Sequence, residues 1–412
     1  MNESCELTIE SLAFGGAGIS RLDGEVVFIP GVLPGERVRV SIVDHRRSFC
    51  RARLLEVLDA VPERIAPVCP FAVIPWSRPL ATSPFCPGCS YQQMTYAAEC
   101  ESKLRQLQGF LSHAVSGTIP IQVEGAPDPL GYRNKGVLHA AVEEGACRLG
   151  YVQEDNHTVL DIPECPLLHP ALNACLAELR GRPGFLKGFR DQARLTLRRT
   201  EPDGAIWWRG SPKSSDPWLH ETTLLGDLLV PRNAFFQVNP AVANRLLEWV
   251  QTRIRSSSCA TVIDLYCGVG IFGLIAAAEG RTVFGVESHG QAIDAARINT
   301  GRLGFDPARV TWLTGDAARV WPTWAESLDL KTCQVVIDPP RTGLDPELCR
   351  HLTQRPVNSL LYISCGPDTL ARDLKQLTDG GYAIRSVALF DMFPRTPHFE
   401  TAVELVSCAT RE

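Results

Sequence analysis

The second half of the chain alternates short apolar segments with longer, helix-like segments from Phe235 onward. The clearest apolar segment covers residues 261–265 and runs into two closely spaced glycines and an Ala-rich stretch. Such alternation is the signature of a parallel sheet whose strands are joined by helical crossovers. Open sheets of this kind bind ligands at the carboxyl ends of their strands. We therefore expect an α/β domain over residues 231–412, with a ligand site at that edge.

Glycines and carboxylates follow the predicted strands where a cofactor site needs them. Gly268 and Gly270 permit a tight turn and close approach of the backbone to a ligand. Glu287 ends the second strand, where a carboxylate can accept both ribose hydroxyls, and Asp316 ends a third, where its side chain can reach an adenine. The glycines formally fit the G-x-G-x-x-G pattern of dinucleotide sites, but the Asp-Leu-Tyr-Cys before them does not resemble nicotinamide enzymes. The context favours S-adenosylmethionine over a dinucleotide.

The composition describes a soluble globular protein of two or three domains. Hydrophobic residues make up 45% and charged residues 21% of the 412 positions, and no apolar run approaches the roughly 20 residues of a membrane helix. The first four residues do not begin a secretory signal, so we expect a cytoplasmic protein whose fifteen cysteines are reduced. The net charge of -5 gives no global case for nucleic-acid binding, so that case has to be local.

Residues 1–60 are predicted to form a small barrel. Alternating apolar and polar segments are separated by glycine-containing turns at residues 15–18, 23–24 and 34–36. Positive charge concentrates around the later strands, which suits contacts with phosphates, although a solvated strand face explains the same pattern. The arginines concerned are Arg37, Arg39, Arg46, Arg47, Arg51 and Arg53.

A proline-rich connection at residues 62–84 carries the first of three cysteines. Sixteen residues separate Cys69 from Cys86, which forms a Cys-x-x-Cys pair with Cys89. Such a pair alone is ambiguous among zinc, redox and cluster roles. An irregular loop can turn backbone amides toward cluster sulfurs as a helix cannot. Three cysteines in one irregular segment therefore favour a metal centre.

Residues 359–374 contain the most plausible reactive side chain. Residues 360–363 read as a short buried strand, and Ser364-Cys365-Gly366-Pro367 breaks it at once, with Thr369 placed to cap a following helix. Cys365 then projects from a strand end. A thiol in this position is either a small hydrophobic side chain or one whose thiolate the helix dipole favours. The residues alone leave both interpretations open.

Two motifs resemble those of the RNA uracil-5-methyltransferases. Ser-Cys-x-Pro-x-Thr-Leu-x-Arg-Asp at residues 364–373 is similar to the nucleophile motif of that family, and Phe-Pro-x-Thr-x-His-x-Glu at residues 393–400 to its closing motif. The resemblance covers essentially the whole chain, and residues 1–60 look like a TRAM domain, an OB-like barrel found on RNA-modifying enzymes. It implies that Cys365 attacks the uracil ring and that Glu400 is the base.

The resemblance also implies two cofactors. It assigns S-adenosylmethionine contacts to Gln237, Tyr266, Glu287 and Asp338. Many family members hold a [4Fe-4S] cluster, whose ligands in this chain are then Cys69, Cys86, Cys89 and Cys165; zinc on the same four thiolates is the alternative. The chain departs from the family pattern in the long spacing after Cys69, with an insertion at residues 74–83, and in Ile271, where related enzymes often carry Asn.

These observations predict three domains and one reaction. The domains are an OB-like TRAM barrel at residues 1–60, a cluster-bearing α+β domain at 61–230 and a Rossmann-like methyltransferase domain at 231–412. We expect a monomer that transfers a methyl group from S-adenosylmethionine to carbon 5 of a uridine in structured RNA, with ribosomal RNA favoured over transfer RNA. An aromatic side chain with two cations, Tyr132, Arg133 and Lys135, is expected to face the RNA.

Two other functions fit part of the sequence. A methyltransferase of another substrate needs the cofactor residues but neither the barrel nor the pair of Cys365 and Glu400. A non-catalytic RNA-binding or RNA-folding protein needs the barrel but not the cofactor residues. Calorimetry distinguishes the second alternative, because such a protein would not bind the cofactor.

Overall fold

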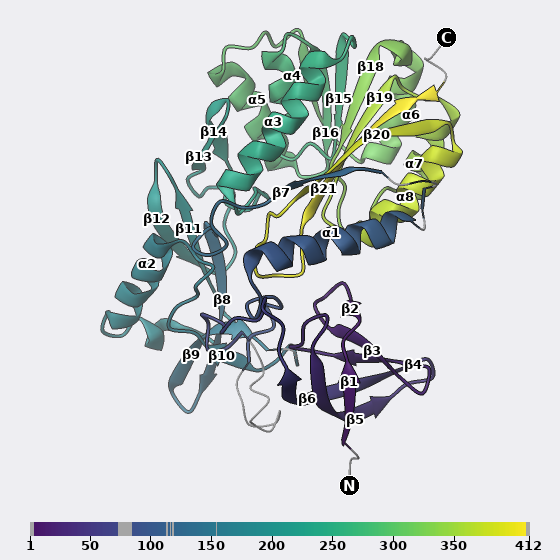
Figure 1. Ribbon diagram of the computed structural model, residues 1–412. Helices are drawn as coiled ribbons and strands as arrows, with labels where there is room; N and C mark the ends of the chain where they lie inside the picture. The colour runs from purple at the N-terminus through teal and green to yellow at the C-terminus, as the bar shows by residue number, and fades with distance from the viewer. Residues whose placement is uncertain are drawn as a thin grey trace. The chain divides into compact units, whose positions relative to one another are not determined.

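The chain forms two compact units in the computed structural model (Figure 1), which describes residues 4–72, 85–112, 114–115, 117, 119–153 and 155–408. The first unit comprises residues 1–106, 128–197 and 393–398, and the second comprises residues 107–127, 198–392 and 399–412. Unit boundaries fall inside helix α1 (Tyr96–Ser112) and inside strand β11 (Arg194–Thr200). The domain limits at residues 60 and 230 stay predictions.

The second unit is built on an eight-stranded sheet with the order β17-β16-β15-β18-β19-β21-β20-β7. In chain order its strands are β7 (Ile121–Glu124), β15 (Thr261–Leu265), β16 (Thr282–Glu287), β17 (Val310–Thr314), β18 (Cys333–Ile337), β19 (Ser359–Ser364), β20 (Tyr382–Phe390) and β21 (Glu400–Ser407). Strands β15 to β19 are parallel, whereas β21 runs antiparallel to both of its neighbours. The strand order reverses between β15 and β18, where open sheets bind ligands. The predicted α/β fold is confirmed.

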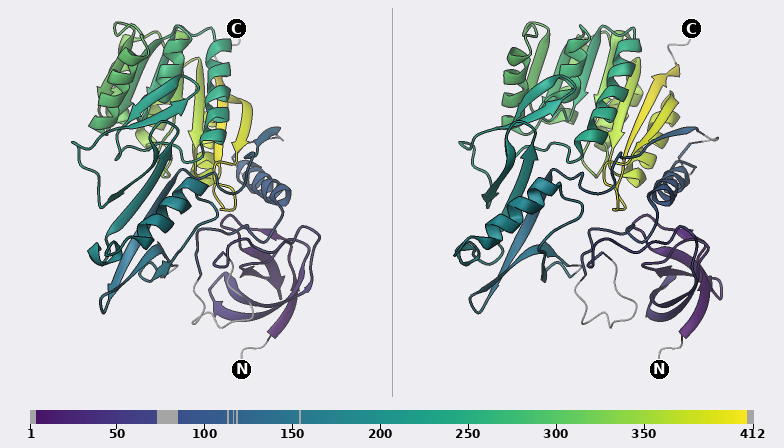
Figure 2. Two further views of the ribbon diagram at one scale, coloured as in Figure 1. Left: turned by 90° about the vertical axis from the view of Figure 1, so that its left-hand side faces the viewer. Right: turned by 60° about the vertical axis from the view of Figure 1, so that its left-hand side comes forward.

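Helices cover both faces of this sheet (Figures 1 and 2). One face carries α3 (Pro240–Ser256), α4 (Ile271–Ala278) and α5 (Gly290–Arg302), and the other carries α6 (Ala317–Ser327), α7 (Pro346–Gln354) and α8 (Pro367–Asp379). Trp321 of α6, Leu348 of α7 and Leu374 of α8 pack into one core with Val335 and Tyr362 of the sheet. Burial of these apolar side chains fixes the sheet edge on which the predicted site lies.

The N-terminal strands of the first unit form a six-stranded sheet with the order β1-β5-β6-β4-β3-β2. Its strands are β1 (Ser4–Thr8), β2 (Ser11–Leu12), β3 (Gly18–Leu22), β4 (Glu25–Ile29), β5 (Arg37–His45) and β6 (Phe49–Asp59). Alternate side chains, among them Val27, Ile29, Val38 and Val40, are fully buried in one core. Figure 2 shows these strands, in purple, curling around that core, as predicted for a small barrel.

A second sheet has the order β10-β9-β8-β11-β12. Its further strands are β8 (Lys135–Glu143), β9 (Ala146–Val152), β10 (Val159–Asp161) and β12 (Gly204–Arg209). Helix α2 (Pro170–Gly181) packs Leu172 and Leu176 against Leu138 and Leu149 of the sheet. A hairpin of β13 (Leu219–Thr223) and β14 (Gly226–Val230) belongs to the second unit, and 3-10 turns occupy Leu186–Gly188 and Leu330–Thr332.

One predicted helix start is wrong. Helix α8 begins after Gly366, with Pro367 in its first turn, and not at Thr369. Proline suits the first helical turn because its fixed φ is already helical and its missing N–H would have no partner there. The hydroxyl of Thr369 instead donates to the Arg341 carbonyl at 3.2 Å. Within the described residues, no helix has both the length and the apolar character that crossing a membrane requires.

Candidate active site and cofactor site

The strand order brings Cys365 and Glu400 together. Cys365 follows the last residue of β19, and Glu400 is the first residue of β21. These strands are antiparallel neighbours, and the last pair of their ladder is Ser364 with Thr401, so the next residue on each side falls opposite the other. Asp338 follows β18, which is the parallel neighbour of β19. A thiol and two carboxyl groups therefore meet at one edge of the sheet.

Burial decides the protonation state of Cys365. Burial raises the pKa of its thiol to about 11, the Glu400 carboxyl group acts in the same direction, and the Arg341 guanidinium opposes both. Desolvation is the largest cause of this shift. Cys365 is therefore a thiol near neutral pH, and its proton has to leave before the sulfur can act as a nucleophile.

Glu400 is 4% exposed. Burial and the neighbouring Asp338 raise the pKa of Glu400 well above its usual range, while Arg341 opposes the shift. The pKa of Asp338 itself is raised to about 7 by burial and by Glu287. A carboxylate with a raised pKa is a stronger proton acceptor than an exposed one. The surroundings of Glu400 therefore suit a general base.

Arg341 is the cation of this group, and the sequence analysis assigned it no role. Its guanidinium lowers the pKa of both Cys365 and Glu400. Its carbonyl accepts the Thr369 hydroxyl, which ties the loop after β18 to helix α8. Gly366 lies against the same carbonyl, and a Cβ there would come within 2.8 Å of the Thr369 Oγ1. The signal in the sequence was an arginine directly after paired prolines in a loop expected to line the site.

The end of the predicted nucleophile motif has a structural role. Asp373 is 1% exposed, and its Oδ2 accepts the Tyr362 hydroxyl at 2.7 Å and the Leu344 N–H at 2.8 Å. Its Oδ1 accepts Nε of Arg372 at 2.8 Å. Loss of this carboxylate would leave buried donors without acceptors. Asp373 therefore fixes α8 on β19, and with it the turn that carries Cys365.

The loop between β15 and α4 has the geometry of a cofactor cradle. Gly268 has a φ of +54°, and a Cβ placed there would meet nothing within 4 Å, so this side of the loop is open. Gly270, with a φ of +82°, has to be glycine because a Cβ would lie 2.7 Å from the Trp312 ring. Glu287, at the end of β16, accepts the backbone N–H groups of Gly268 at 3.2 Å and His289 at 2.9 Å.

The remaining predicted cofactor contacts add acceptor atoms. Oε1 of Gln237 is buried and lacks a hydrogen-bond partner among the described residues. Tyr266 has a φ of +62°, and burial raises the pKa of its hydroxyl to about 12. Asp316 is exposed, and its Oδ1 accepts the Arg319 N–H at 3.0 Å, which caps α6 and leaves Oδ2 for a ligand.

These residues fit S-adenosylmethionine. An orphaned buried acceptor at Gln237 calls for a ligand with N–H or O–H donors. The carboxyl group of Glu287 raises the pKa of Asp338, because two negative charges repel each other. A ligand with positive charge would relieve this repulsion. S-adenosylmethionine offers an ammonium group, a sulfonium, ribose hydroxyls and an adenine amino group, which together meet both requirements.

The four cysteines predicted to bind metal lie in the first unit, within electrostatic range of one another. Burial is the main cause of the raised pKa of Cys69, Cys86 and Cys89, and the charge of Cys165 raises the pKa of all three further. Cys69, Cys89 and Cys165 also pack against Leu167 in one small cluster. The residues brought together are those that the sequence singled out. The insertion at residues 74–83 lies outside the described residues.

N–H groups point at several of these sulfurs. Gln92 donates to Sγ of Cys89 at 3.3 Å, the backbone of Gly88 donates toward Cys86, and two backbone groups donate toward Cys69. Hydrogen bonds to cysteine sulfur are among the features that set the properties of an iron-sulfur cluster. Four neighbouring thiols, of which Cys89 is buried and the other three are partly buried, fit a [4Fe-4S] cluster.

The spacing of the quartet also bears on zinc. A tetrahedral zinc ion holds its sulfur ligands about 3.8 Å apart, because each lies about 2.3 Å from the metal. Among the described residues, three or more metal-ligand atoms lie within 4.8 Å of one another in a different group, Glu25 with His45 and Cys50, and the cysteine quartet does not meet this criterion. Zinc on the same four thiolates stays the alternative to a cluster.

Known proteins match the chain along its length. Residues 229–408 match the family described as tRNA (Uracil-5-)-methyltransferase, and residues 2–55 match the TRAM domain. The chain is 31% identical to the 23S rRNA (uracil(1939)-C(5))-methyltransferase RlmD of Halomonas elongata, over 97% of this chain and 89% of that protein. The chain belongs to the RNA uracil-5-methyltransferase family.

A further relative is described as an RNA methyltransferase, and a solved structure shares the fold. A protein of Halalkalibacterium halodurans described as an uncharacterized RNA methyltransferase is 29% identical, over 98% of this chain and 97% of that one. The solved structure of the Pyrococcus abyssi tRNA (uracil-54, C5)-methyltransferase, in complex with S-adenosyl-L-homocysteine, matches with a TM-score of 0.73 at 23% identity, over 98% of this chain and 100% of that one. The family and the multidomain fold with an N-terminal TRAM domain are as predicted.

The prediction for Tyr132 is wrong. Its side chain, expected to stack on a base, is 9% exposed, and its hydroxyl donates to the Pro394 carbonyl at 3.0 Å. Asn134 is also buried, at 2% exposure, whereas Arg133 and Lys135 are partly exposed. The aromatic ring of this family motif is therefore structural in the free protein, and the two cations stay candidates for phosphate contacts.

A buried network beside the closing family motif was missed. Glu99 and Lys103 of α1 are both fully buried, and Glu99 accepts Nζ of Lys103 at 2.8 Å and the Arg395 N–H at 2.6 Å. Arg395 has a φ of +67°, and Lys103 donates to the Phe393 carbonyl at 3.3 Å. This network fixes the backbone of the motif that ends in Glu400. In the sequence, a glutamate four residues before a lysine looks like an ordinary surface pair, so no signal marked it.

Proposed function

We propose that this protein transfers a methyl group from S-adenosylmethionine to carbon 5 of a uridine in structured RNA, with Cys365 as nucleophile and Glu400 as general base. The observation that carries the proposal is the meeting of these two side chains at the ends of β19 and β21, in a member of a uracil-5-methyltransferase family. Ribosomal RNA is the favoured substrate, because the Halomonas relative is named for a uracil of 23S rRNA.

Cys365 and Glu400 act at opposite ends of the reaction. Carbon 5 of uracil is a poor nucleophile until the Cys365 thiolate adds to carbon 6 and converts the ring into an enolate. Carbon 5 then forms the new bond to the methyl group and still carries its proton. The Glu400 carboxylate removes that proton, the ring regains its double bond, and the bond between carbon 6 and sulfur breaks. The thiolate is released unchanged. Besides methylated RNA, the reaction would yield S-adenosylhomocysteine, which is left when the bond between the methyl group and the sulfonium breaks, and one proton.

The proton chemistry follows from the surroundings of the two residues. The raised pKa of Cys365 makes the thiolate scarce but strongly nucleophilic, and Arg341 stabilises it. The raised pKa of Glu400 makes its carboxylate a strong base, and Arg341 stabilises the ionised form here too. One guanidinium thus supports the reactive form of both residues.

The cofactor and the cluster have separate residues in this proposal. S-adenosylmethionine, when bound, supplies an electrophilic methyl group from its sulfonium. Gln237, Tyr266, Glu287, Asp316 and Asp338 hold it beside the loop at Gly268. A [4Fe-4S] cluster on Cys69, Cys86, Cys89 and Cys165 is assigned a structural role in the first unit, because the reaction needs no electron transfer.

Some of the six arginines singled out in the barrel sequence are better placed than the others to contact RNA. Arg37, Arg39 and Arg46 form ion pairs with carboxylates of the barrel itself. Arg47, Arg51 and Arg53 form none within the described part of the chain. Arg51 also lies over the Phe49 ring, 5.8 Å from its centre, so a cation and an aromatic face stand together. Such pairs bind single-stranded RNA by phosphate contact and base stacking.

Methylation of purified RNA tests the reaction. The protein is incubated with S-adenosylmethionine carrying a labelled methyl group and with ribosomal or transfer RNA from cells that lack the enzyme. Nucleosides are then separated and identified by mass spectrometry. We expect labelled 5-methyluridine, at a higher yield from ribosomal RNA. Label in another nucleoside would contradict uridine as the target, and label in protein alone would contradict an RNA substrate.

A further inference from the structure

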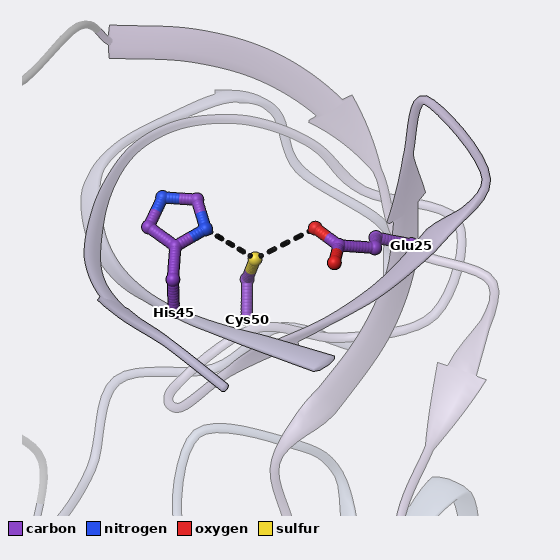
Figure 3. A group of neighbouring side chains, drawn as sticks. All are labelled: Glu25, His45 and Cys50. Carbon is purple, nitrogen blue, oxygen red and sulfur yellow. Dashed lines mark hydrogen bonds between the residues drawn. The ribbon is translucent and has the colours of Figure 1, made fainter. Parts of the chain in front are cut away.

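We propose that Glu25, His45 and Cys50 bind one zinc ion at the rim of the N-terminal barrel. The three residues play no part in the proposed methyl transfer, and they lie in the strands that match the TRAM domain. Sγ of Cys50 lies 3.0 Å from Nδ1 of His45 and 3.2 Å from Oε2 of Glu25 (Figure 3). All three ligand atoms lie within 4.8 Å of one another.

The sheet holds these side chains in place through regular pairing. His45 ends β5 and Cys50 follows the start of β6, and the two are direct partners across this antiparallel pair. Val27 of β4 is the partner of Cys50 on the other side, and Glu25 lies two residues before it on the same face. The Arg46 N–H donates to the Phe49 carbonyl at 2.9 Å and closes the turn between His45 and Cys50. The three donor atoms thus come from adjacent strands of one framework.

The donor set selects the metal. A thiolate, an imidazole nitrogen and a carboxylate oxygen are the three protein ligands that zinc takes, whereas magnesium and calcium prefer oxygen alone. A tetrahedral ion at zinc bond lengths needs these atoms about 3.5 Å apart. The present contacts to sulfur are a few tenths of an ångström shorter, and rotation of the Glu25 and His45 side chains, which are both exposed, opens them. Water completes the fourth position.

Burial of Cys50 argues against a reactive thiol. The residue is 1% exposed and packs in the barrel core with Val27 and Val38, so a substrate has no access to its sulfur. A small ion reaches it from the rim, between the two exposed partners. On binding, the thiol loses its proton to solvent and the sulfur forms a bond to zinc, with no change in oxidation state.

The charge around the three residues favours a cation. Within the described parts of the chain, Glu25 pairs with no arginine or lysine, and its polar contact is the thiol. A thiol has one proton, so it can donate to Glu25 or to His45 but not to both. A divalent ion satisfies the carboxylate, the imidazole and the sulfur at once. Zinc here joins the end of β5 to the starts of β4 and β6.

Zinc titration of the full-length protein tests the site, with iron content measured in parallel to monitor the cysteine quartet. We expect the unsubstituted protein to bind one zinc ion per chain at this site. His45→Ala and Glu25→Gln should each bind that ion at least about tenfold more weakly. His157→Ala, at another exposed histidine, and Cys89→Ser, in the quartet, should keep this zinc ion. Equal zinc binding in the unsubstituted protein and in His45→Ala overturns the proposal.

Thermal unfolding of the unsubstituted protein gives a test that needs no variant to fold. Zinc that binds only the folded barrel raises the melting temperature, and a chelator reverses the rise. The rise should be absent in His45→Ala, whose circular dichroism checks that it is folded. A melting temperature that does not respond to zinc in the unsubstituted protein overturns the proposal and leaves the three residues as a hydrogen-bonded group.

Discussion

The cysteine quartet and the Cys365 site place the same side chain in opposite surroundings. In the quartet, one buried and three partly buried thiols interact with one another, and N–H groups donate to the sulfurs of Cys69, Cys86 and Cys89. At the edge of the large sheet, a single partly exposed thiol faces two carboxyl groups and a guanidinium. Burial raises the pKa in both places, so the pKa alone does not separate them. The neighbours do: mutual thiols suit a metal centre, and a proton acceptor beside one thiol suits covalent chemistry.

The largest expected effect is the loss of Cys365. Cys365→Ala should lower methyl transfer by at least about a thousandfold, because no other group can add to carbon 6. Cys349→Ala is the matched control, since burial raises the pKa of that thiol to about 11 as well, with Asp373 and Arg372 as its charged neighbours. Cys349 is 1% exposed, so its loss should cost about 1 kcal/mol of stability and leave turnover intact. Initial rates with labelled S-adenosylmethionine measure both.

Equal losses of methyl transfer in Cys365→Ala and in Cys349→Ala would mean that the two thiols do not differ in function. A Cys365→Ala enzyme that still methylates uridine would make Cys365 a structural residue.

Glu400→Gln should have the second-largest effect. Turnover should fall by about 10²- to 10⁴-fold, which is typical for removal of a general base. Methyl incorporation in a single turnover should persist, because addition and methyl transfer precede the step that needs the base. Rapid-quench measurements with enzyme in excess over RNA separate the two steps. Loss of the single-turnover signal as well would reassign the base role and leave Cys365 as nucleophile.

Cys89→Ser addresses the other region. The protein purified without oxygen should show broad visible absorbance from an iron-sulfur cluster, and this variant should lose it together with its iron. Cys175→Ser, at a partly buried cysteine of α2, should keep both. Residual activity of Cys89→Ser, when it is folded, should exceed that of Cys365→Ala by far, because a cluster on these cysteines would have no part in the proposed reaction. Zinc without iron in the unsubstituted protein would contradict the cluster.

The smallest expected effect is a pH dependence of stability. Burial raises the pKa of Asp264 from 3.8 to about 8, and burial raises that of Asp338 to about 7. Between pH 3.8 and 8 the folded state therefore binds more protons than the unfolded state, so stability falls as the pH rises. In Asp264→Asn, the melting temperature measured by calorimetry should fall by about 2 to 4 °C less between pH 3.8 and 8 than in the unsubstituted protein. The control Asp155→Asn removes an exposed carboxylate, and its melting temperature should fall with rising pH as in the unsubstituted protein.

The sequence predicted the fold of the second unit because each strand and each crossover carries its own local pattern. The apolar segment before Tyr266, the glycines after it and Glu287 all fall where the structure has them. The insertion of β21 between β19 and β20 could not be predicted in this way, since local patterns carry no strand order. That insertion is what brings Glu400 to Cys365, and resemblance to a family rather than periodicity suggested the pair.

Buried charges account for most of what the sequence did not reveal. Asp373, Glu99 and Lys103 look like surface residues on helices, and only tertiary packing turns them into buried acceptors and donors. The sequence analysis considered the prolines before Arg341 and not Arg341 itself. Its effect on the pKa of Cys365 and Glu400 depends on β19 and β21, which are distant in the sequence. The wrong prediction for Tyr132 has a similar cause, because its burial depends on Pro394, which is far away in the sequence. The wrong prediction for Thr369 has a local cause, since Pro367 already suits the first turn of α8.

Trapping of the reaction intermediate tests the account most directly. Glu400→Gln is incubated with S-adenosylmethionine and a uridine-containing RNA, denatured and digested, and the protein peptides are analysed by mass spectrometry. We predict a peptide in which Cys365 carries a methylated uridine, and no such adduct in a protein that also carries Cys365→Ala. An adduct on another residue, or methylated RNA released by Glu400→Gln as fast as by the unsubstituted protein, would contradict the account.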